Sequence, residues 1–308
     1  MKALGIVLAV VIGLQGAALA APAQQKTFES LDDAVNALIS AFRTGDRKAI
    51  VDVLGPLGRP LVSSGDDTAD RRGFQRFVAE YDRAHRLEGG GGKVILYVGA
   101  DDFPFPIPLV PDGPRWFWDT DAGDDEILYR RVGRNELSTI QVCLAFVDAQ
   151  REYYAVDRTG AGILEYAQHF ASSAGKRDGL YWATRPDERP SPLGPLVAQA
   201  RARGYTKQGG GGPVPYEGYF YRILLAQGPD APGGAYDFVV RGHMIGGFAL
   251  VAFPAKYGVS GIMTFIVSHD GVVYQKDLGP KTPQIAEAMK TYNPDRTWQK
   301  TAAFTSAR

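Results

Sequence analysis

The sequence predicts an α+β protein built from two consecutive parts. Apolar residues recur at helical spacing between residues 31 and 82, and short apolar runs separated by turn residues follow between residues 93 and 119. A long helical pattern at residues 135–157 then precedes further strand-like runs between residues 219 and 277. Helices followed by hairpin-connected strands are typical of α+β folds.

The first part, residues 27–132, is predicted to begin with three helices. Ser30 suits the N-cap of the first helix, and Gly45 supplies its C-cap. The second helix covers residues 46–54 and is closed by Gly-Pro, and the third covers residues 67–82. The first and third helices carry their apolar residues along one side.

The sheet of the first part is predicted from the runs VILYV, FPIPLV and RWFWD, with a turn at Asp112-Gly113. The glycine run 88–92 is interpreted as a turn between helix and sheet. It lacks the Gly-Lys-Ser/Thr that opens a helix in a phosphate-binding loop. Three helices followed by antiparallel strands predict a small cone of the NTF2-like or cystatin-like kind, as a fold analogy.

The second part, residues 133–298, is predicted to begin with the long amphipathic helix 135–157. The acidic run Asp124–Glu126 is interpreted as a charge cluster at a helix N-terminus, where negative charge is favoured. A loop-rich stretch over residues 157–215 follows the long helix.

Strands dominate the rest of the second part, before a final helix at residues 282–292 and a flexible tail at residues 299–308. The strand runs are YFYRILLAQ, AYDFVVRG, GGFALVAFP, GIMTFIVS and GVVYQKD, the last two joined by a hairpin turn at Asp270-Gly271.

Residues 1–20 have the pattern of a secretory signal peptide. Lys2 supplies the positive start, residues 3–14 are apolar, and Ala18-Leu19-Ala20 offers a small-residue cleavage site. The apolar run is shorter than the roughly 20 residues that a spanning helix needs. We therefore expect a mature chain that is exported to the periplasm or secreted, with no membrane span.

Composition limits the partners. The chain has 34 basic and 34 acidic residues, and this balance argues against nucleic acid, which requires a concentrated basic field. The one cysteine, Cys143, cannot form an intramolecular disulfide and lies on the apolar side of the long helix, where we expect it to be buried. The expected partner is an unidentified small molecule or envelope protein.

A ligand pocket is predicted in the first part. Asp101, Asp102 and Asp119 flank its strands, and Trp116 and Trp118 share one sheet face because they are two residues apart. Pockets lined by aromatic rings with a few polar groups are typical binding sites. The alternative interpretation is ordinary core and rim packing.

A calcium loop is the best metal candidate. Asp157 and Thr159 occupy the first two ligand positions, Gly162 suits the turn, and Glu165 supplies a later acid. Ala161 stands at the third ligand position and offers no side-chain oxygen, so the predicted affinity for calcium is low. The alternative interpretation is a turn that ends the long helix, and no other cofactor is predicted.

No catalytic residue is predicted. The four histidines lack metal-ligand spacing, and the chain has no G-x-S-x-G nucleophile motif. The first hypothesis is therefore a non-enzymatic binding protein. The alternatives are a hydrolase or isomerase with a carboxylate base in the N-terminal cone, and an accessory component of a pilus or secretion assembly.

Long sequence words resemble a known bacterial family. They include DDFPFPIPLV, RRVGRNELSTIQVCLAFVDAQREY, GYFYRILLAQGPDAPGGAYDF and MIGGFALVAFPAKYGVSGIMTFIV. In this order they resemble the bacterial domain-of-unknown-function family 2950, over about residues 28–298. The resemblance implies an exported protein, and it implies no catalytic residues because the family has no assigned activity.

Shorter words in the second part resemble the globular head of type IV pilins and pseudopilins. They are Asn135-Glu136-Leu137 at the start of the helix, Gln150 to Tyr153, Gly179 to Trp182, and Tyr257 to Gly261. The apolar anchor helix of a pilin is absent, and the predicted cone stands in its place. The resemblance implies a head of one long helix and an antiparallel sheet, which is the basis of the assembly alternative.

Overall fold

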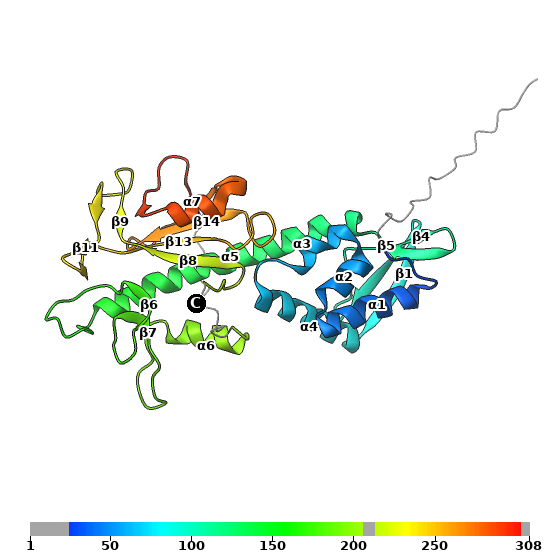
Figure 1. Cartoon of the computed structure of the whole chain (residues 1–308), viewed down its shortest axis with the longest axis horizontal. Helices are drawn as coiled ribbons and strands as arrows, with labels where there is room; N and C mark the ends of the chain where they lie inside the picture. The colour runs from blue at the N-terminus through cyan, green and yellow to red at the C-terminus, as the bar shows by residue number, and fades with distance from the viewer. Residues whose placement is uncertain (1–24, 206–212, 303–308) are drawn as a thin grey trace, which may run out of the picture.

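The structure, a computed structural model, describes residues 25–205 and 213–302. The signal peptide predicted at residues 1–20 and most of the predicted tail lie outside these residues. The fold is α+β, as predicted, with two lobes placed end to end and one long helix, α5 (Asp124–Tyr154), running through both (Figure 1).

Four α-helices build the N-terminal lobe: α1 (Leu31–Thr44), α2 (Arg47–Leu54), α3 (Arg59–Val62) and α4 (Asp67–Arg83), with the 3-10 turn Pro56–Gly58 before α3. The predicted caps of α1 are confirmed. The Ser30 hydroxyl accepts a hydrogen bond from the backbone N–H of Asp33, and Gly45 has a left-handed backbone with φ of 66°.

The N-terminal sheet consists of β1 (His85–Gly90), β2 (Lys93–Val98), β3 (Phe103–Pro104), β4 (Leu109–Asp112) and β5 (Arg115–Trp118), all antiparallel, in the order β1-β2-β4-β5 with β3 beside β2. The turn predicted at residues 88–92 is wrong in part. Residues up to Gly90 pair with β2, and the turn itself is Gly91-Gly92, where both φ angles are positive. The run FPIPLV predicts a strand at residues 105–110, but β4 begins only at Leu109.

Helix α5 begins earlier than predicted. The sequence predicts residues 135–157, but the helix starts at Asp124 and ends at Tyr154, after the 3-10 turn Thr120–Ala122. The predicted acidic cluster at its N-terminus is confirmed. The predicted boundary near residue 132 lies inside α5, where Val132 is buried, so the lobes share this helix.

The main C-terminal sheet is antiparallel and has the order β17-β15-β14-β13-β8. All six residues of β13 are buried, because α5 and α7 cover its two faces (Figure 1). The predicted turn at Asp270-Gly271 is confirmed. The strands are β8 (Tyr219–Leu224), β13 (Ala249–Pro254), β14 (Met263–Ser268), β15 (Val273–Asp277) and β17 (Gln299–Lys300). Helix α7 (Thr282–Ala288) follows the 3-10 turn Gly279–Lys281 and is shorter than the predicted helix at residues 282–292.

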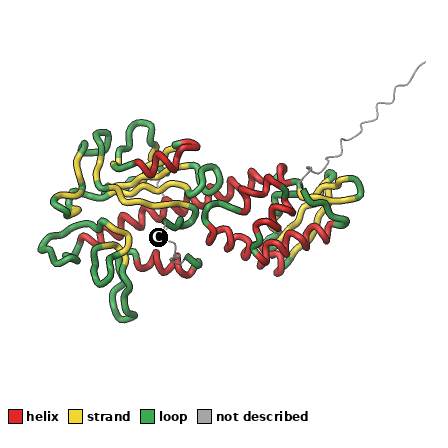
Figure 2. Tube along the Cα trace, viewed as in Figure 1, coloured by secondary structure: helices red, strands yellow, loops and turns green. Residues whose placement is uncertain are grey.

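The segment predicted as loop-rich contains regular structure. It holds helix α6 (Gly194–Ala202) and the parallel pair β6 (His169–Ala171) and β7 (Gly179–Tyr181). Short strands complete the C-terminal lobe: β9 (Ala226–Gln227), β10 (Tyr236–Asp237), β11 (Val239–Val240), β12 (His243–Met244) and β16 (Thr291–Tyr292). Figure 2 shows strands packed beside helices in both lobes.

Each lobe has its own hydrophobic core. The N-terminal core is centred on fully buried side chains such as Leu38, Ile50 and Trp118, and the C-terminal core on Phe146 and Phe265. Cys143 is completely buried in the C-terminal core, as predicted. Within residues 25–205 and 213–302, no helix combines the length and the apolar character required to cross a membrane.

Candidate ligand-binding site

A groove between α4 and α5 opens into the core of the N-terminal lobe. Its cavity volume is about 220 Å³. Stacked and edge-to-face aromatic rings form much of its floor, with Phe42 5.1 Å from Phe74 and 5.3 Å from Phe77, measured between ring centroids. The apolar floor consists mainly of Phe42, Leu54, Leu61, Phe74, Phe77 and Phe105.

Four arginines line the groove above this floor. Arg72 and Arg76 are four residues apart on α4, and Arg131 and Arg134 are three residues apart on α5. These spacings place each pair on one side of its helix, and both pairs line the groove. The described lining residues include two carboxylates, and four positive charges less two negative charges leave a net charge of +2.

The arginines differ in how fully they are paired. Arg131 donates to the backbone carbonyl oxygens of Pro60, at 2.8 Å, and of Leu61. Burial lowers the pKa of Arg134, and the positive charge of Arg76 lowers it further. Across the described residues, no protein group makes a hydrogen bond or ion pair with Arg76 or Arg134, so both guanidinium groups can bind a ligand.

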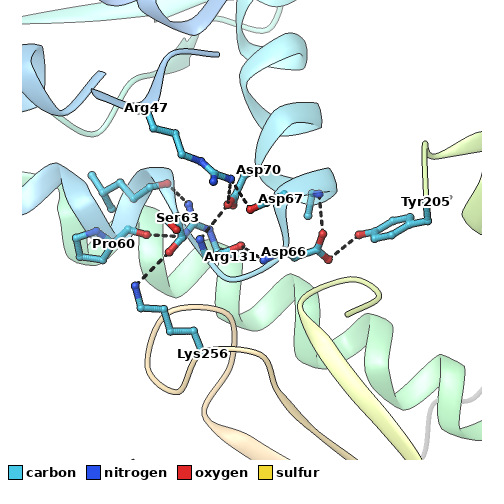
Figure 3. Close-up of polar contacts among 12 residues, drawn as sticks. Arg47, Pro60, Ser63, Asp66, Asp67, Asp70, Arg131, Tyr205 and Lys256 are labelled. Carbon is cyan, nitrogen blue, oxygen red and sulfur yellow. Dashed lines mark hydrogen bonds and ion pairs between the residues drawn. The ribbon is translucent and has the colours of Figure 1, made fainter. Parts of the chain in front are cut away.

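Asp70 is the carboxylate on the inner wall of the groove. It accepts hydrogen bonds from the backbone N–H of Ser64, at 3.0 Å, and from the Arg47 guanidinium, at 3.3 Å (Figure 3). Burial raises the pKa of Asp70, while Ser64 and the nearby arginines oppose that shift. Asp70 therefore has protein partners already and supports the wall of the groove.

The groove lies beside the junction of the two lobes. Asp66, the N-cap of α4, accepts a hydrogen bond from the Tyr205 hydroxyl at 2.8 Å (Figure 3). It accepts another from the Gly218 N–H at 2.9 Å. In the opposite direction, Glu217 of the C-terminal lobe accepts from Arg72 at 3.2 Å. The Lys256 ammonium adds a hydrogen bond to the Ser63 carbonyl at 3.3 Å. A carboxylate of each lobe therefore accepts hydrogen bonds from the other lobe: Asp66 from the C-terminal lobe and Glu217 from the N-terminal lobe.

The five residues predicted to line a pocket lie elsewhere. Trp118 is fully buried in the N-terminal core, where its indole N–H donates to the Ala34 carbonyl at 3.2 Å, and Trp116 packs partly against the same core. Asp101 and Asp102 are exposed. Asp102 forms an ion pair with Arg86 at 3.0 Å, and Asp119 precedes the 3-10 turn that begins at residue 120. None of the five predicted residues lines the α4–α5 groove.

The predicted calcium ligands are engaged with protein groups. The Asp157 carboxylate accepts backbone N–H groups from Gly160, Ala161 and Gly162. Glu165 accepts from the Thr159 hydroxyl at 2.6 Å and pairs with Nδ1 of His243 at 2.9 Å. Over the described chain, no group of three His, Cys, Asp or Glu side chains could hold a metal ion.

Sequence reasoning missed the arginines of the groove. Their spacing of three and four residues within each helix is visible in the sequence. In the chain, however, all the strands of the N-terminal sheet lie between α4 and α5, so the sequence does not show that the two helices are neighbours. Gly73, between Arg72 and Phe74 on α4, was a further signal. A Cβ added there would have no atom within 4 Å, so the absent side chain leaves the groove open.

Comparison with known proteins identifies a family and no closer relative. The family model described as "Protein of unknown function (DUF2950)" matches residues 25–301. No curated protein and no solved structure matches the chain, so the resemblances to NTF2-like cones and pilin heads are not confirmed. The match covers nearly all of the chain, which therefore belongs to the DUF2950 family.

Proposed function

We propose that this chain is an exported binding protein, and that the α4–α5 groove takes a small organic anion. The observation that carries the proposal is the set of four arginines above an apolar floor, with two carboxylates against them. Export rests on the signal-peptide pattern of residues 1–20. A ligand with an anionic group and a compact apolar body fits both halves of the groove.

The arginines determine which anionic group of the ligand can bind. A guanidinium group presents N–H donors in a planar fork that matches the oxygens of a carboxylate or phosphate. Arg76 and Arg134 supply this chemistry without giving up an existing protein partner in the described structure.

The apolar floor determines which apolar part of the ligand can bind. Phe74 and Phe77 are partly buried and line the groove, so they offer aromatic surface to a ring or short chain. Covering apolar surface contributes roughly 25 cal/mol for each Å² removed from water. A free inorganic anion would leave this surface uncovered, and we therefore expect it to bind more weakly than the corresponding aryl ester.

Phenyl phosphate is a suitable probe, with phenol and inorganic phosphate as its two halves. Isothermal titration calorimetry of the purified protein should show the highest affinity for the intact ester. The double variant R76A/R134A should bind it at least about tenfold more weakly. The matched control is R71A/R83A, which removes two arginines of α4 that do not line the groove.

Two results would contradict the proposal: equal affinity of both double variants for phenyl phosphate, or no binding to the unmodified protein. Native mass spectrometry of the protein purified from its own compartment complements the titration. A retained organic anion would identify the natural ligand by mass.

A further inference from the structure

We infer that Glu217 competes with the ligand for Arg72, so that a phosphate monoester in the groove loosens the junction between the lobes. This inference rests on the proposed function and specifies its ligand class. Glu217 lies just before β8 and is the one described lining residue that comes from the chain after α5. Its carboxylate oxygen Oε1 accepts from Arg72 at 3.2 Å and from Arg203 at 2.7 Å.

The backbone holds Glu217 firmly at the edge of the groove. Glu217 has a φ of 50°, a left-handed conformation that is unfavourable for a residue with a side chain. Its N–H donates to the Tyr205 hydroxyl at 3.1 Å, and the next N–H, of Gly218, donates to Asp66. A Cβ at Gly218 would lie 2.4 Å from Nδ2, the side-chain nitrogen of Asn135, so only glycine fits at this position beside α5.

Arg72 can change partner without leaving Glu217 unpaired. Arg203 approaches the same carboxylate more closely than Arg72 does, and it belongs to the same lobe as Glu217. When an anion enters the groove, Arg72 can turn to it while Arg203 retains Glu217. The ion pair between Arg72 and Glu217 crosses the junction, so this exchange removes one contact between the lobes.

The number of arginines favours a dianion with three free oxygens. Arg76 and Arg134 have no protein partner in the described structure, and Arg72 becomes the third donor group once it leaves Glu217. A phosphate monoester offers an oxygen to each guanidinium, whereas a carboxylate has only two oxygens. The second negative charge strengthens the attraction to the three guanidinium groups, and this gain exceeds the added repulsion from the single Glu217 carboxylate.

The charge competition is tested by titrating phenyl phosphate and benzoate into the unmodified protein and into E217Q. The unmodified protein should prefer phenyl phosphate. Removing the competing charge should tighten phenyl phosphate binding by about tenfold, within the usual range of coupling between sites. Glu136→Gln is the matched control, because Glu136 also joins two elements, through the N–H groups of Ile262 and Met263, and does not line the groove.

Arg203 provides a second variant that does not alter the groove. In R203A, Glu217 keeps Arg72 as its ion-pair partner, so phenyl phosphate should bind several-fold more weakly than to the unmodified protein. In R203A/E217Q this loss should disappear, because no carboxylate competes for Arg72. Circular dichroism spectra and melting temperatures of all variants identify any that fail to fold.

Loosening of the junction is measured by hydrogen exchange of the peptide that contains Glu217 and Gly218. Phenyl phosphate should speed exchange of these amides in the unmodified protein, and should change it little in E217Q. If phenyl phosphate binds but E217Q binds no tighter and exchange is unchanged, the inference is overturned and the proposed function stands. If phenyl phosphate binds to neither protein, both are overturned.

Discussion

Replacing Asp66 by alanine should destabilise the protein far more than the loss of a helix cap. The Asp66 side chain is almost completely buried and serves three donors: the N–H of Ala69 in the first turn of α4, the Tyr205 hydroxyl and the N–H of Gly218. The first contact is an ordinary N-cap. The other two connect the lobes, and both donors lie in the buried junction.

The magnitude follows from these contacts. Loss of a cap costs about 1 kcal/mol, and a buried donor left without an acceptor costs about 1–3 kcal/mol. Two such donors are left, the Tyr205 hydroxyl and the Gly218 N–H, so Asp66→Ala should lower the free energy of unfolding by about 3–7 kcal/mol in total. Asp46→Ala is the control, because Asp46 caps α2 through the N–H groups of Lys48 and Ala49 on the exposed surface and should cost only about 1 kcal/mol.

Urea titrations followed by circular dichroism give the free energies of unfolding for both variants and for the unmodified protein. The slope of the transition also shows whether the lobes still unfold together once the junction is weakened. Equal losses in the two variants would refute the reasoning, because they would mean that the contacts of Asp66 across the junction contribute nothing beyond a cap.

Three further predictions concern the groove, the cysteine and the loop after α5. Gly73→Ala should raise the free energy of unfolding by about 0.5–1 kcal/mol, because alanine favours a helix interior. Gly73→Leu should block the binding of phenyl phosphate. The control is Gly133→Ala on α5, where an added Cβ also meets open space; it should stabilise the protein equally and leave the affinity for phenyl phosphate unchanged. A Gly73→Leu protein that melts normally and still binds phenyl phosphate would place the ligand elsewhere. Burial raises the pKa of Cys143 to about 12, so the folded protein should not react with a disulfide reagent at pH 8, whereas the unfolded protein should show one thiol, and rapid labelling before unfolding would contradict this. Hydrogen bonds from Gly162 and then from Gly160 lower the pKa of Asp157 below its ordinary 3.8, so its contribution to stability is present above pH 3.8 and lost as the pH falls through the lower folded-state value. An NMR titration of this carboxyl group should show a midpoint under 3.8, and a midpoint above it would rule out that contribution.

Local signals predicted the fold best. The ends of α1 could be placed from Ser30 and Gly45 because caps depend on a few adjacent residues. The glycine run at the end of β1 predicts a turn because glycine is depleted in strands, yet residues up to Gly90 pair with β2, which supplies their hydrogen bonds whatever the side chains are. Gly133 suggested a boundary, but one glycine costs a helix only about 1 kcal/mol, and burial of neighbours such as Val132 outweighs it.

The site could not be predicted because it depends on contacts between distant elements. Two tryptophans on one strand face are compatible with a pocket or with a core, and only tertiary packing distinguishes them; Trp118 belongs to the core. The groove requires α4 to lie beside α5, so that Arg72 and Arg134 line one cavity although five strands lie between them in the sequence. Helix spacing orders the arginines within each helix and carries no information on which helices are neighbours.

Helix α5 has a consequence for how the molecule can be divided. Its 31 residues extend about 46 Å, and its two ends are embedded in different hydrophobic cores, with Ile127 and Leu128 in one and Phe146 in the other. A gene fragment that stops at the apparent boundary would encode a half-helix with an uncovered apolar side. Either half expressed alone should aggregate or be degraded, so we expect these lobes to be exchanged or duplicated only together, as one inherited unit.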